Sequence, residues 1–384
     1  MIRIVFVITG LSTGGAETML LKLLERIDRA RFEPHVISLT DEGEIGRRIR
    51  LLDISVEALE MRRGVVAFSK VMLLVRRLRG LHPQVLHTWM YHADLLGGLA
   101  GRAASIPAIG WGLRNSNLDQ SGSKWTTRAI MRACAALSYV VPRRILSCSE
   151  RARDVHVAVG YCARKIVVIP NGFDLELFRP DADAAMSIRR ELGIDVTVPL
   201  VGLAARYDAQ KNHKGFIEAA GRVHDTMPGV HFVLAGDGVT FANAELADAI
   251  DRAGVRGVFH LLGRRNDMPQ LMAGLDVLCS SSSYGEAFPN VLGEAMACGV
   301  PCVVTDAGDS ADIVGDTGRV VPVGDMAGLA RELMALLSMP AEQRQSLGRM
   351  ARLRVQERYE ISSAVKQYEA FYMSLLDGKE TCVA

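Results

Sequence analysis

Short runs of apolar, β-branched residues alternate along the chain with longer stretches in which apolar residues recur at helical spacing. In the first half the strand-like runs are residues 2–8, 35–39, 85–88, 108–112, 144–148 and 166–169. Stretches with helical periodicity lie between them, at 18–27, 68–78, 95–104 and 126–139. Continuous apolar strands between helices are typical of parallel sheets that are buried on both faces. The first half therefore predicts a doubly wound α/β domain.

The same alternation starts again after residue 195. Strand-like runs occupy 198–204, 231–235, 258–261, 277–280 and 301–305, with helical stretches at 215–223, 244–253, 268–273 and 291–297. We expect two facing Rossmann-like domains, 1–180 and 181–355, with a cleft between them. A C-terminal helix, within 356–384, is expected to pack back on the first domain. Because ligands of such sheets bind at the carboxyl ends of the strands, the loops after the strands should carry the chemistry.

Composition narrows the class of protein. Of 384 residues, 49% are hydrophobic and 23% are charged, which excludes disordered and fibrous proteins. Seven cysteines without a C-x-x-C pair argue against a disulfide framework and a cysteine-rich zinc site, and they favour a reducing compartment. The sequence has neither a signal-like N-terminus nor a membrane-length apolar run. We therefore expect a cytoplasmic protein.

The small net charge of +2 hides an asymmetry. Residues 1–180 contain 26 basic and 16 acidic residues, whereas the remainder contains 19 and 27. Six basic residues fall within eighteen positions that include no acid: Arg62, Arg63, Lys70, Arg76, Arg77 and Arg79. The apolar residues among them, from Phe68 to Leu78, indicate either an ordinary helix that packs on the sheet or a basic amphipathic helix on an anionic membrane. No nucleic-acid partner is expected.

Two loops after predicted strands carry residues suited to a phosphate. Gly14 and Gly15 lie between the first strand and the first helix, where glycines let the backbone approach an anion or simply form a tight turn. Arg206 and Lys211 follow the first strand of the second domain. They are either two cations that can reach one diphosphate or a solvated basic loop.

The loop and helix after strand 277–280 are the most informative stretch. Glu286 lies in the loop, and Pro289 is suited to the first helical position. The amides of Asn290, Val291 and Leu292 would then favour a phosphate. Glu294 follows one turn later among apolar neighbours. A pair of glutamates is ordinarily a cap or a salt bridge, but a buried carboxylate in an apolar helix needs a partner.

Glu286 and Glu294, with seven residues between them, resemble the E-x7-E signature of the family 4 (group 1) retaining glycosyltransferases. Segments 13–17, 169–174, 178–180, 206–211, 235–238 and 262–263 resemble further motifs of that family, in the same order along the chain. The family has the GT-B fold. The resemblance implies a metal-independent hexosyltransferase without cofactor, which takes a nucleotide diphosphate sugar and a hydroxyl acceptor. Together with the basic first domain, it suggests a lipid-linked acceptor at the inner membrane face, as in polysaccharide or lipopolysaccharide assembly.

The resemblance also implies roles for individual residues. Glu286, Arg206 and Lys211 would be catalytic, with the two cations on the diphosphate and Glu286 beside the donor sugar. Residues expected to bind the donor are Glu294 on the ribose, together with Gly15, Asn290, Val291, Leu292, Gly236, Gly263 and Arg264. The first domain would bind the acceptor through Gly14, His87, His92, Arg114 and Asn115.

One departure from the family pattern affects the acceptor side. Many members place a histidine after the fourth or fifth strand, where this chain has Arg114 and Asn115. Either of these residues takes that role, whereas His87 and His92 either contribute or only satisfy local hydrogen bonds. Two other functions remain open from the sequence: a nucleotide-sugar epimerase of the same fold, and a non-catalytic two-lobed sugar-binding protein. The sugar, the base and the acceptor are not specified by the sequence.

Overall fold

The computed structural model describes residues 1–62, 67–116 and 125–377. It divides into two compact units: unit 1 comprises Met1–Gly172 with Ile361–Ala384, and unit 2 is Phe173–Glu360. The chain therefore passes between units at 172/173 and at 360/361, a few residues from the 180/181 and 355/356 divisions expected from the sequence. Each unit is described separately.

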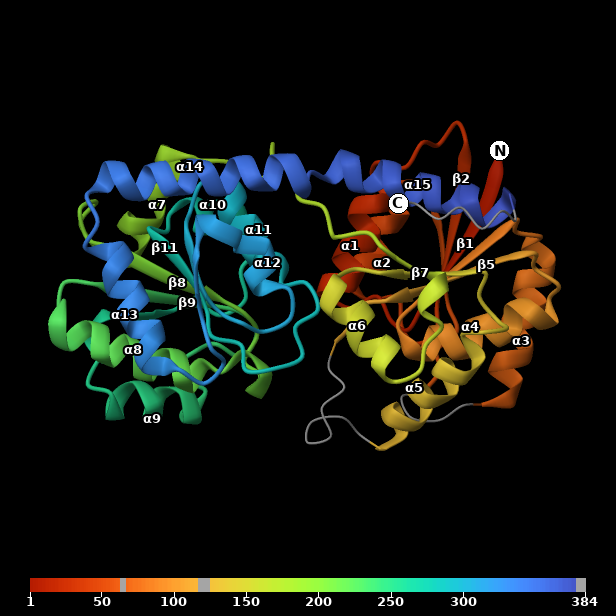
Figure 1. Cartoon of the computed structure of the whole chain (residues 1–384), viewed down its shortest axis with the longest axis horizontal. Helices are drawn as coiled ribbons and strands as arrows, with labels where there is room; N and C mark the ends of the chain where they lie inside the picture. The colour runs from red at the N-terminus through yellow and green to blue at the C-terminus, as the bar shows by residue number, and fades with distance from the viewer. Residues whose placement is uncertain (63–66, 117–124, 378–384) are drawn as a thin grey trace. The chain divides into compact units, whose positions relative to one another are not determined.

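Unit 1 is built on a seven-stranded parallel sheet with the order β3-β2-β1-β4-β5-β6-β7 (Figure 1). The strands are β1 (Ile2–Ile8), β2 (Phe32–Ser38), β3 (Ser55–Ala58), β4 (Val85–Trp89), β5 (Ala108–Leu113), β6 (Arg144–Ser147) and β7 (Ile166–Val168). The helices are α1 (Gly15–Leu24), α2 (Gly43–Arg50), α3 (Phe68–Leu81), α4 (Tyr91–Ala103), α5 (Trp125–Leu137), α6 (Glu150–Ala158) and α15 (Ile361–Asp377). Strand β1 alternates its side chains between two cores, with Phe6 in one and Val7 in the other.

The C-terminal helix α15 belongs to the core of unit 1. Its Tyr368, Phe371, Tyr372 and Leu375 are buried with residues of β1 and α1. Space for this helix is made within the sheet, because a side chain at Gly110 of β5 would lie 3.0 Å from the ring of Phe371. The helix is therefore packed on the first sheet although it follows the whole of unit 2 in the sequence.

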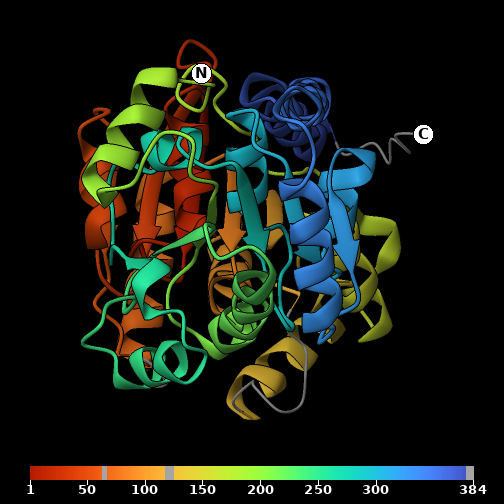
Figure 2. The same ribbon diagram turned by 90° about the vertical axis from the view of Figure 1, so that its left-hand side faces the viewer.

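Unit 2 contains a six-stranded parallel sheet with the order β10-β9-β8-β11-β12-β13 (Figure 2). Its strands are β8 (Leu200–Ala204), β9 (His231–Ala235), β10 (Phe259–Leu261), β11 (Val277–Ser280), β12 (Cys302–Thr305) and β13 (Arg319–Val321). Its helices are α7 (Ala182–Leu192), α8 (His213–Thr226), α9 (Ala244–Arg252), α10 (Met268–Ala273), α11 (Asn290–Ala297), α12 (Ser310–Val314), α13 (Met326–Leu337) and α14 (Ala341–Arg358). Helices α8 and α13 pack side by side over one core, and α11 packs on α14. The doubly wound α/β fold expected from the sequence is confirmed in both units.

Two short strands and several boundaries differ from the sequence expectation. The strand β3 has four residues and β13 has three, and each contains exposed or half-buried positions, so neither forms an apolar run. Helix α1 begins at Gly15 rather than at residue 18. Helix α11 begins at Asn290, so Pro289 occupies the position before the first helical residue and not the first position itself.

Helix α3 has the packing of an ordinary surface helix along most of its apolar side. Leu74, Val75 and Leu78 are buried in the core of unit 1. Phe68 and Met72 remain 76% and 40% exposed. Arg63 lies outside the described residues. Among the described residues, no helix combines the length and the hydropathy needed to cross a membrane.

Candidate functional site

The loop after β8 carries the two predicted diphosphate ligands of unit 2. Arg206 follows the strand, and Lys211 ends a short 3-10 helix, Ala209–Lys211, whose first turn is capped by the Asp208 carboxylate at 3.0 Å from the Gln210 amide. Arg206 is exposed, and its guanidinium lies 3.3 Å from Asp208. The cap on the 3-10 helix thus also orients the first cation.

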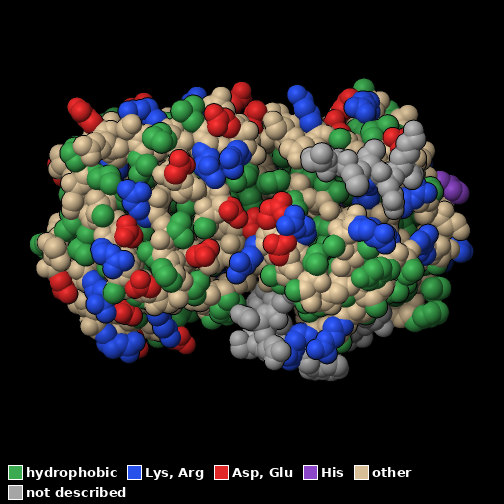
Figure 3. Space-filling view, viewed as in Figure 1, with side chains coloured by type: hydrophobic (Ala, Val, Ile, Leu, Met, Phe, Trp, Pro, Cys, Tyr) green, Lys and Arg blue, Asp and Glu red, His purple; other side chains and the backbone are tan. Residues whose placement is uncertain are grey.

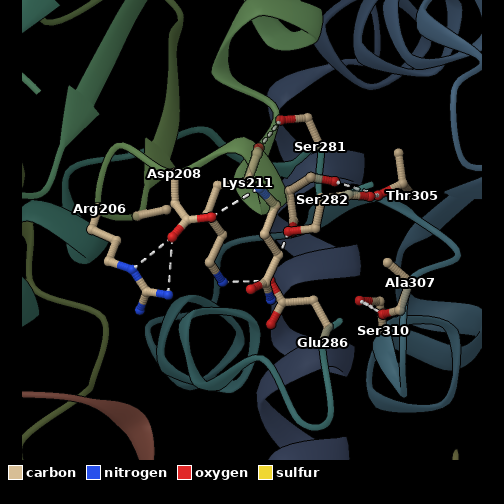
Figure 4. A network of polar contacts seen from close by, with 12 residues as sticks. Arg206, Asp208, Lys211, Ser281, Ser282, Glu286, Thr305, Ala307 and Ser310 are labelled. Atoms are coloured by element: carbon tan, nitrogen blue, oxygen red, sulfur yellow. Dashed lines mark hydrogen bonds and ion pairs between the residues drawn. The ribbon is translucent and has the colours of Figure 1, made fainter. Parts of the chain in front are cut away.

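Lys211 and Glu286 meet in the structure (Figure 4). The Lys211 ammonium donates to Glu286 Oε1, and the same oxygen accepts a hydrogen bond of 2.7 Å from the Ser282 hydroxyl. Glu286 is 6% exposed. The two residues come together because β8 and β11 are neighbours in the sheet, so that their following loops share one edge. A buried carboxylate is stable here because it is paired with a charge and a hydroxyl.

The backbone also presses closely around Glu286. Gly308, in the loop after β12, has a φ of +60°, and a side chain there would lie 2.0 Å from the Glu286 carbonyl oxygen. Ser281 donates from its hydroxyl to the carbonyls of Lys211 and Asn212, at 2.9 and 3.1 Å. The ends of β8, β11 and β12 are therefore joined around the Lys211–Glu286 pair.

Helix α11 continues from this loop. Glu294 is half-buried on the helix, one turn beyond Asn290. The Leu292 amide bonds to the Pro289 carbonyl at 3.2 Å, so of the three amides predicted to face a phosphate this one already has an acceptor within the chain. The amides of Asn290 and Val291 lie in the first turn, at the positive end of the helix dipole.

Gly236 and Gly263, two glycines predicted to bind the donor, lie in loops that are joined by backbone hydrogen bonds. The Gly236 amide bonds to the Gly263 carbonyl at 2.8 Å, and the Gly263 amide bonds to Val239 at the same distance. The Tyr207 amide reaches the Asp237 carbonyl at 2.7 Å. These bonds bring the loops after β8, β9 and β10 together. Arg264 follows Gly263 and is exposed.

These residues of unit 2 provide cations, a helix N-terminus and carboxylates at one edge of a parallel sheet. Such an edge can bind an anion through Lys211, Arg206 and backbone amides, and hydroxyl groups through Glu286 and Glu294. Within the ranges that the structure describes, no group of three or more His, Cys, Asp or Glu side chains is arranged to hold a metal ion.

In unit 1, the predicted Gly-Gly loop lies at the carboxyl end of β1. Gly14 precedes the first helical residue and is extended, and Gly15 opens α1. A side chain at Gly14 would lie 2.3 Å from a carboxylate oxygen of Glu17. The loop is thus a compact strand-to-helix turn, and its amides lie at a helix N-terminus, where an anion is favoured.

Arg114 follows β5 and is engaged by groups of its own unit. Its guanidinium lies 3.8 Å from the centroid of the Trp89 ring, donates to Asn171 Oδ1 at 3.0 Å and bonds to the Tyr368 hydroxyl of α15. Burial raises the pKa of Tyr368. Asn115 is exposed, and its carbonyl oxygen accepts from the Tyr91 hydroxyl at 3.3 Å. Arg114 therefore helps to hold α15 on unit 1 through its contact with Tyr368.

The two histidines differ in their accessibility. His87 is fully buried, with Nδ1 accepting from the Trp89 indole at 3.2 Å and lying 3.1 Å from the Tyr372 hydroxyl. Burial, followed by the charge of Arg114, lowers the pKa of His87 well below its usual value. His92 is half-buried at the start of α4, and burial lowers its pKa as well. In this structure His87 offers no surface to an acceptor, whereas His92 does.

Sequence reasoning missed Ser281, Ser282 and Tyr368. The serines lie in a run of four, 280–283, that begins with the last residue of β11, and that position at a strand end is the signal that points to them. Tyr368 has no local signal, because its contact with Arg114 spans 254 positions.

Comparison with known proteins identifies the family of the chain. A family model described as Glycosyltransferase Family 4 matches residues 13–177, and one described as Glycosyl transferases group 1 matches residues 198–339.

Similar proteins include an N,N'-diacetylbacillosaminyl-diphospho-undecaprenol alpha-1,3-N-acetylgalactosaminyltransferase of Campylobacter jejuni, 26% identical over 71% of this chain and 73% of that one. A UDP-Gal:alpha-D-GlcNAc-diphosphoundecaprenol alpha-1,3-galactosyltransferase of Escherichia coli is 26% identical over 58% and 57%. The crystal structure of Anabaena HepE in complex with UDP-glucose has a TM-score of 0.85 at 24% identity, covering 97% of this chain and 100% of that one. The two family models together span most of both units, and the chain belongs to the group 1, family 4 glycosyltransferases of GT-B fold.

Proposed function

We propose that this glycosyltransferase is a retaining, metal-independent enzyme of cell-surface polysaccharide or glycolipid assembly. It moves a hexose-type sugar from a nucleotide diphosphate sugar to a hydroxyl acceptor. The observation that carries the proposal is the ion pair between Lys211, in the loop after β8, and Glu286, in the loop that leads from β11 into α11. This edge combines a cation for a diphosphate with a carboxylate for sugar hydroxyls.

The residues divide the chemistry between them. Lys211 and Arg206 neutralise the charge that develops on the leaving diphosphate, and the first amides of α11 add to that effect. Glu286 accepts hydrogen bonds from the donor sugar, and Glu294 accepts from the ribose. As the bond from the anomeric carbon to phosphate oxygen breaks, the acceptor oxygen bonds to the same face of the sugar, and its proton passes to the leaving phosphate oxygen.

Substitutions in unit 2 test the donor site. Arg206→Ala should lower turnover about 100- to 1,000-fold, the usual loss for one stabiliser of developing charge. Because Arg206 is 59% exposed, its removal should not disturb folding. Glu294→Ala should weaken the binding of free nucleoside diphosphate. Arg222→Ala, on an exposed arginine of α8 that pairs with Glu218, is the matched control. Normal nucleotide affinity and turnover in both site variants would contradict the assignment.

Product analysis separates the transferase from the other functions. An epimerase would convert the donor alone, and a binding protein would give no turnover with any acceptor. The anomeric configuration of the product, measured by NMR, should match that of the donor, and turnover should persist in EDTA. The HepE complex makes UDP-sugars the first donors to test. A thermal-shift series with UDP, GDP, ADP and CMP identifies the base, because a tight ligand stabilises the fold by mass action.

The acceptor is proposed to be lipid-linked, at the inner face of the cell membrane. The names of the C. jejuni and E. coli relatives both specify acceptors on a diphosphate-linked undecaprenol. The residues of unit 1 support an anionic partner, since 1–172 and 361–384 together contain 27 basic and 17 acidic residues.

The outer stripe of α3 supports a membrane contact. Phe68, Met72 and Arg76 follow one another at intervals of four, and all three are exposed. Arg77 pairs with Glu57 at 2.8 Å, and Arg79 donates to the Ala103 carbonyl at 2.7 Å. Both guanidinium groups are therefore held in defined positions at the surface. Blue and green side chains are interspersed around α3 to α5 in Figure 3. Exposed apolar side chains beside arginines suit an anionic bilayer surface.

Co-sedimentation with vesicles that contain anionic lipid, across a salt series, tests this contact. Each arginine near such a surface contributes about 1 kcal/mol. Replacing Arg76, Arg77 and Arg79 by Gln should therefore abolish most binding at low salt, and Phe68→Ser should weaken it further. The same replacement of Arg331, Arg349 and Arg358, on α13 and α14, is the control. Failure of the wild type to bind at low salt would favour a water-soluble acceptor.

A further inference from the structure

The Ser282 side chain lies at the centre of the contacts around Glu286 (Figure 4). It is 2% exposed, and its hydroxyl donates to Glu286 Oε1 at 2.7 Å. Its carbonyl oxygen accepts from the Thr305 hydroxyl at 2.6 Å, and Thr305 is fully buried at the end of β12. Ser282 is therefore fixed by the neighbouring strand while it bonds to the carboxylate.

The second donor to Glu286 Oε1 is the Lys211 ammonium, which is charged, unlike the Ser282 hydroxyl. Lys211 carries a charge that a diphosphate would compete for, and its side chain is 20% exposed. When Lys211 turns toward a phosphate, Glu286 loses part of what holds its orientation. The Ser282 hydroxyl is neutral, is buried and has no anionic substrate to attract it, so its bond to the carboxylate can persist through that exchange.

We propose that Ser282 is the positioning residue that keeps the Glu286 carboxylate aligned with the donor sugar while Lys211 exchanges Glu286 for the diphosphate. This inference rests on the proposed roles of Glu286 and Lys211. Ser282 touches neither the sugar nor the phosphate; it acts through Glu286. Its loss should therefore change the rate of the sugar-transfer step and leave the binding of free nucleoside diphosphate unaltered.

The test compares Ser282→Ala with Ser310→Ala. Ser310 is a fully buried serine of unit 2 whose hydroxyl donates to the Ala307 carbonyl at 2.6 Å, so it matches the substitution, the burial and the unit. Because the loss of one hydrogen bond to a charged group lowers a rate by about 100-fold at most, Ser282→Ala should lower kcat roughly 10- to 100-fold. The Kd for UDP, or for whichever nucleoside diphosphate binds, should stay within twofold, and Ser310→Ala should leave kcat within twofold of the wild type.

A double-mutant cycle makes the result specific to Glu286. In a Glu286→Gln background, the further change Ser282→Ala should alter kcat by less than about threefold, because the two residues act as one unit. Full activity of Ser282→Ala beside an inactive Glu286→Gln would overturn this inference alone. Wild-type turnover in Glu286→Gln would instead overturn the proposed role of Glu286. Equal, additive losses in both backgrounds would show that Ser282 acts on folding and not through the carboxylate.

Discussion

His213 should make the stability of unit 2 depend on pH. It is the first residue of α8 and is 2% exposed. Its Nε2 lies 3.3 Å from the Ala205 carbonyl oxygen, and its buried Nδ1 has no hydrogen-bond partner among the residues that the structure describes. Burial, with a smaller contribution from the charge of Lys211, lowers the pKa of His213 to about 4, against the opposing effects of the Ala205 carbonyl and the charge of Asp208. The folded unit therefore holds a neutral imidazole.

The sign follows from comparing the two states. In the unfolded chain the pKa of a histidine is near 6.5, so below that pH the unfolded state takes up a proton that the folded state refuses. The contribution of His213 to the free energy of unfolding is therefore fully present above about pH 6.5. It is lost as the pH falls toward 4, the pKa of His213 in the folded unit. Between pH 7 and pH 5 this single group should destabilise unit 2 by about 2 kcal/mol.

Hydrogen exchange can measure this loss within unit 2, since a chain with two units need not unfold in one step. Peptides from β8 and α8 are followed by mass spectrometry at pH 7 and pH 5, with rates corrected for intrinsic exchange. His213→Gln keeps an amide donor for the Ala205 carbonyl and removes the titration. Its stability should therefore fall by about 2 kcal/mol less than that of the wild type over this interval. His82→Gln, at an exposed position of unit 1, is the control. Identical pH dependence in the wild type and His213→Gln would refute the reasoning.

Three further substitutions test the packing. Gly348→Ala would place its Cβ 1.9 Å from the Gly299 carbonyl oxygen, where α14 crosses the end of α11, and should cost about 1–3 kcal/mol in urea unfolding of unit 2. Gly80→Ala, near the end of α3, adds a Cβ that meets nothing beyond the neighbouring backbone of its own helix within 4 Å in the described part of the chain, and it should instead stabilise unit 1 by about 0.5–1 kcal/mol in the same assay. Arg114→Lys, which loses the planar fork shared between Asn171 and Tyr368, should speed hydrogen exchange in α15 about tenfold or more.

Local patterns predicted the elements well where the strands are buried on both faces. The central strands β1, β4 and β5 are buried at every position except the first two of β1, which are half-buried, and they appeared as apolar runs in the sequence. The strand β3, at the edge of its sheet, has one buried position beside one exposed and two half-buried positions, so its four residues carry no such signal. Of the four edge strands of the two described sheets, β3 and β13 were therefore missed, whereas β7 and β10 were predicted from their apolar residues.

Specific contacts between distant segments could not be predicted from the sequence, for a different reason. The C-terminal helix was expected to pack back on the first domain, but this expectation did not specify which side chains of unit 1 would contact the buried face of Tyr368, Phe371, Tyr372 and Leu375. Likewise, the position of Arg114 after β5 predicted a loop residue at the carboxyl edge. Only the packing of α15 shows that its guanidinium is held by Tyr368.

The ion pair between Lys211 and Glu286 shows how strand order converts two separate motifs into one unit. Each residue was predicted from its own loop, and the neighbouring positions of β8 and β11 bring them together. Their pairing affects how substitutions must be interpreted. The exposed pair of Arg206 and Asp208 is worth at most about 1 kcal/mol, so Arg206→Ala reports on ligand binding with little effect on folding.

Lys211 is different, because its partner is buried. Removing one member of a buried pair leaves an uncompensated charge, at a typical cost of about 3–5 kcal/mol. Lys211→Ala would therefore lower stability and misplace the Glu286 carboxylate at the same time as it removes a ligand of the diphosphate. A loss of activity in that variant alone cannot assign a role to Lys211. The informative comparison is Lys211→Ala with and without Glu286→Gln: the stability defect should shrink when the carboxylate becomes neutral, whereas a defect in nucleotide affinity that belongs to Lys211 itself should remain.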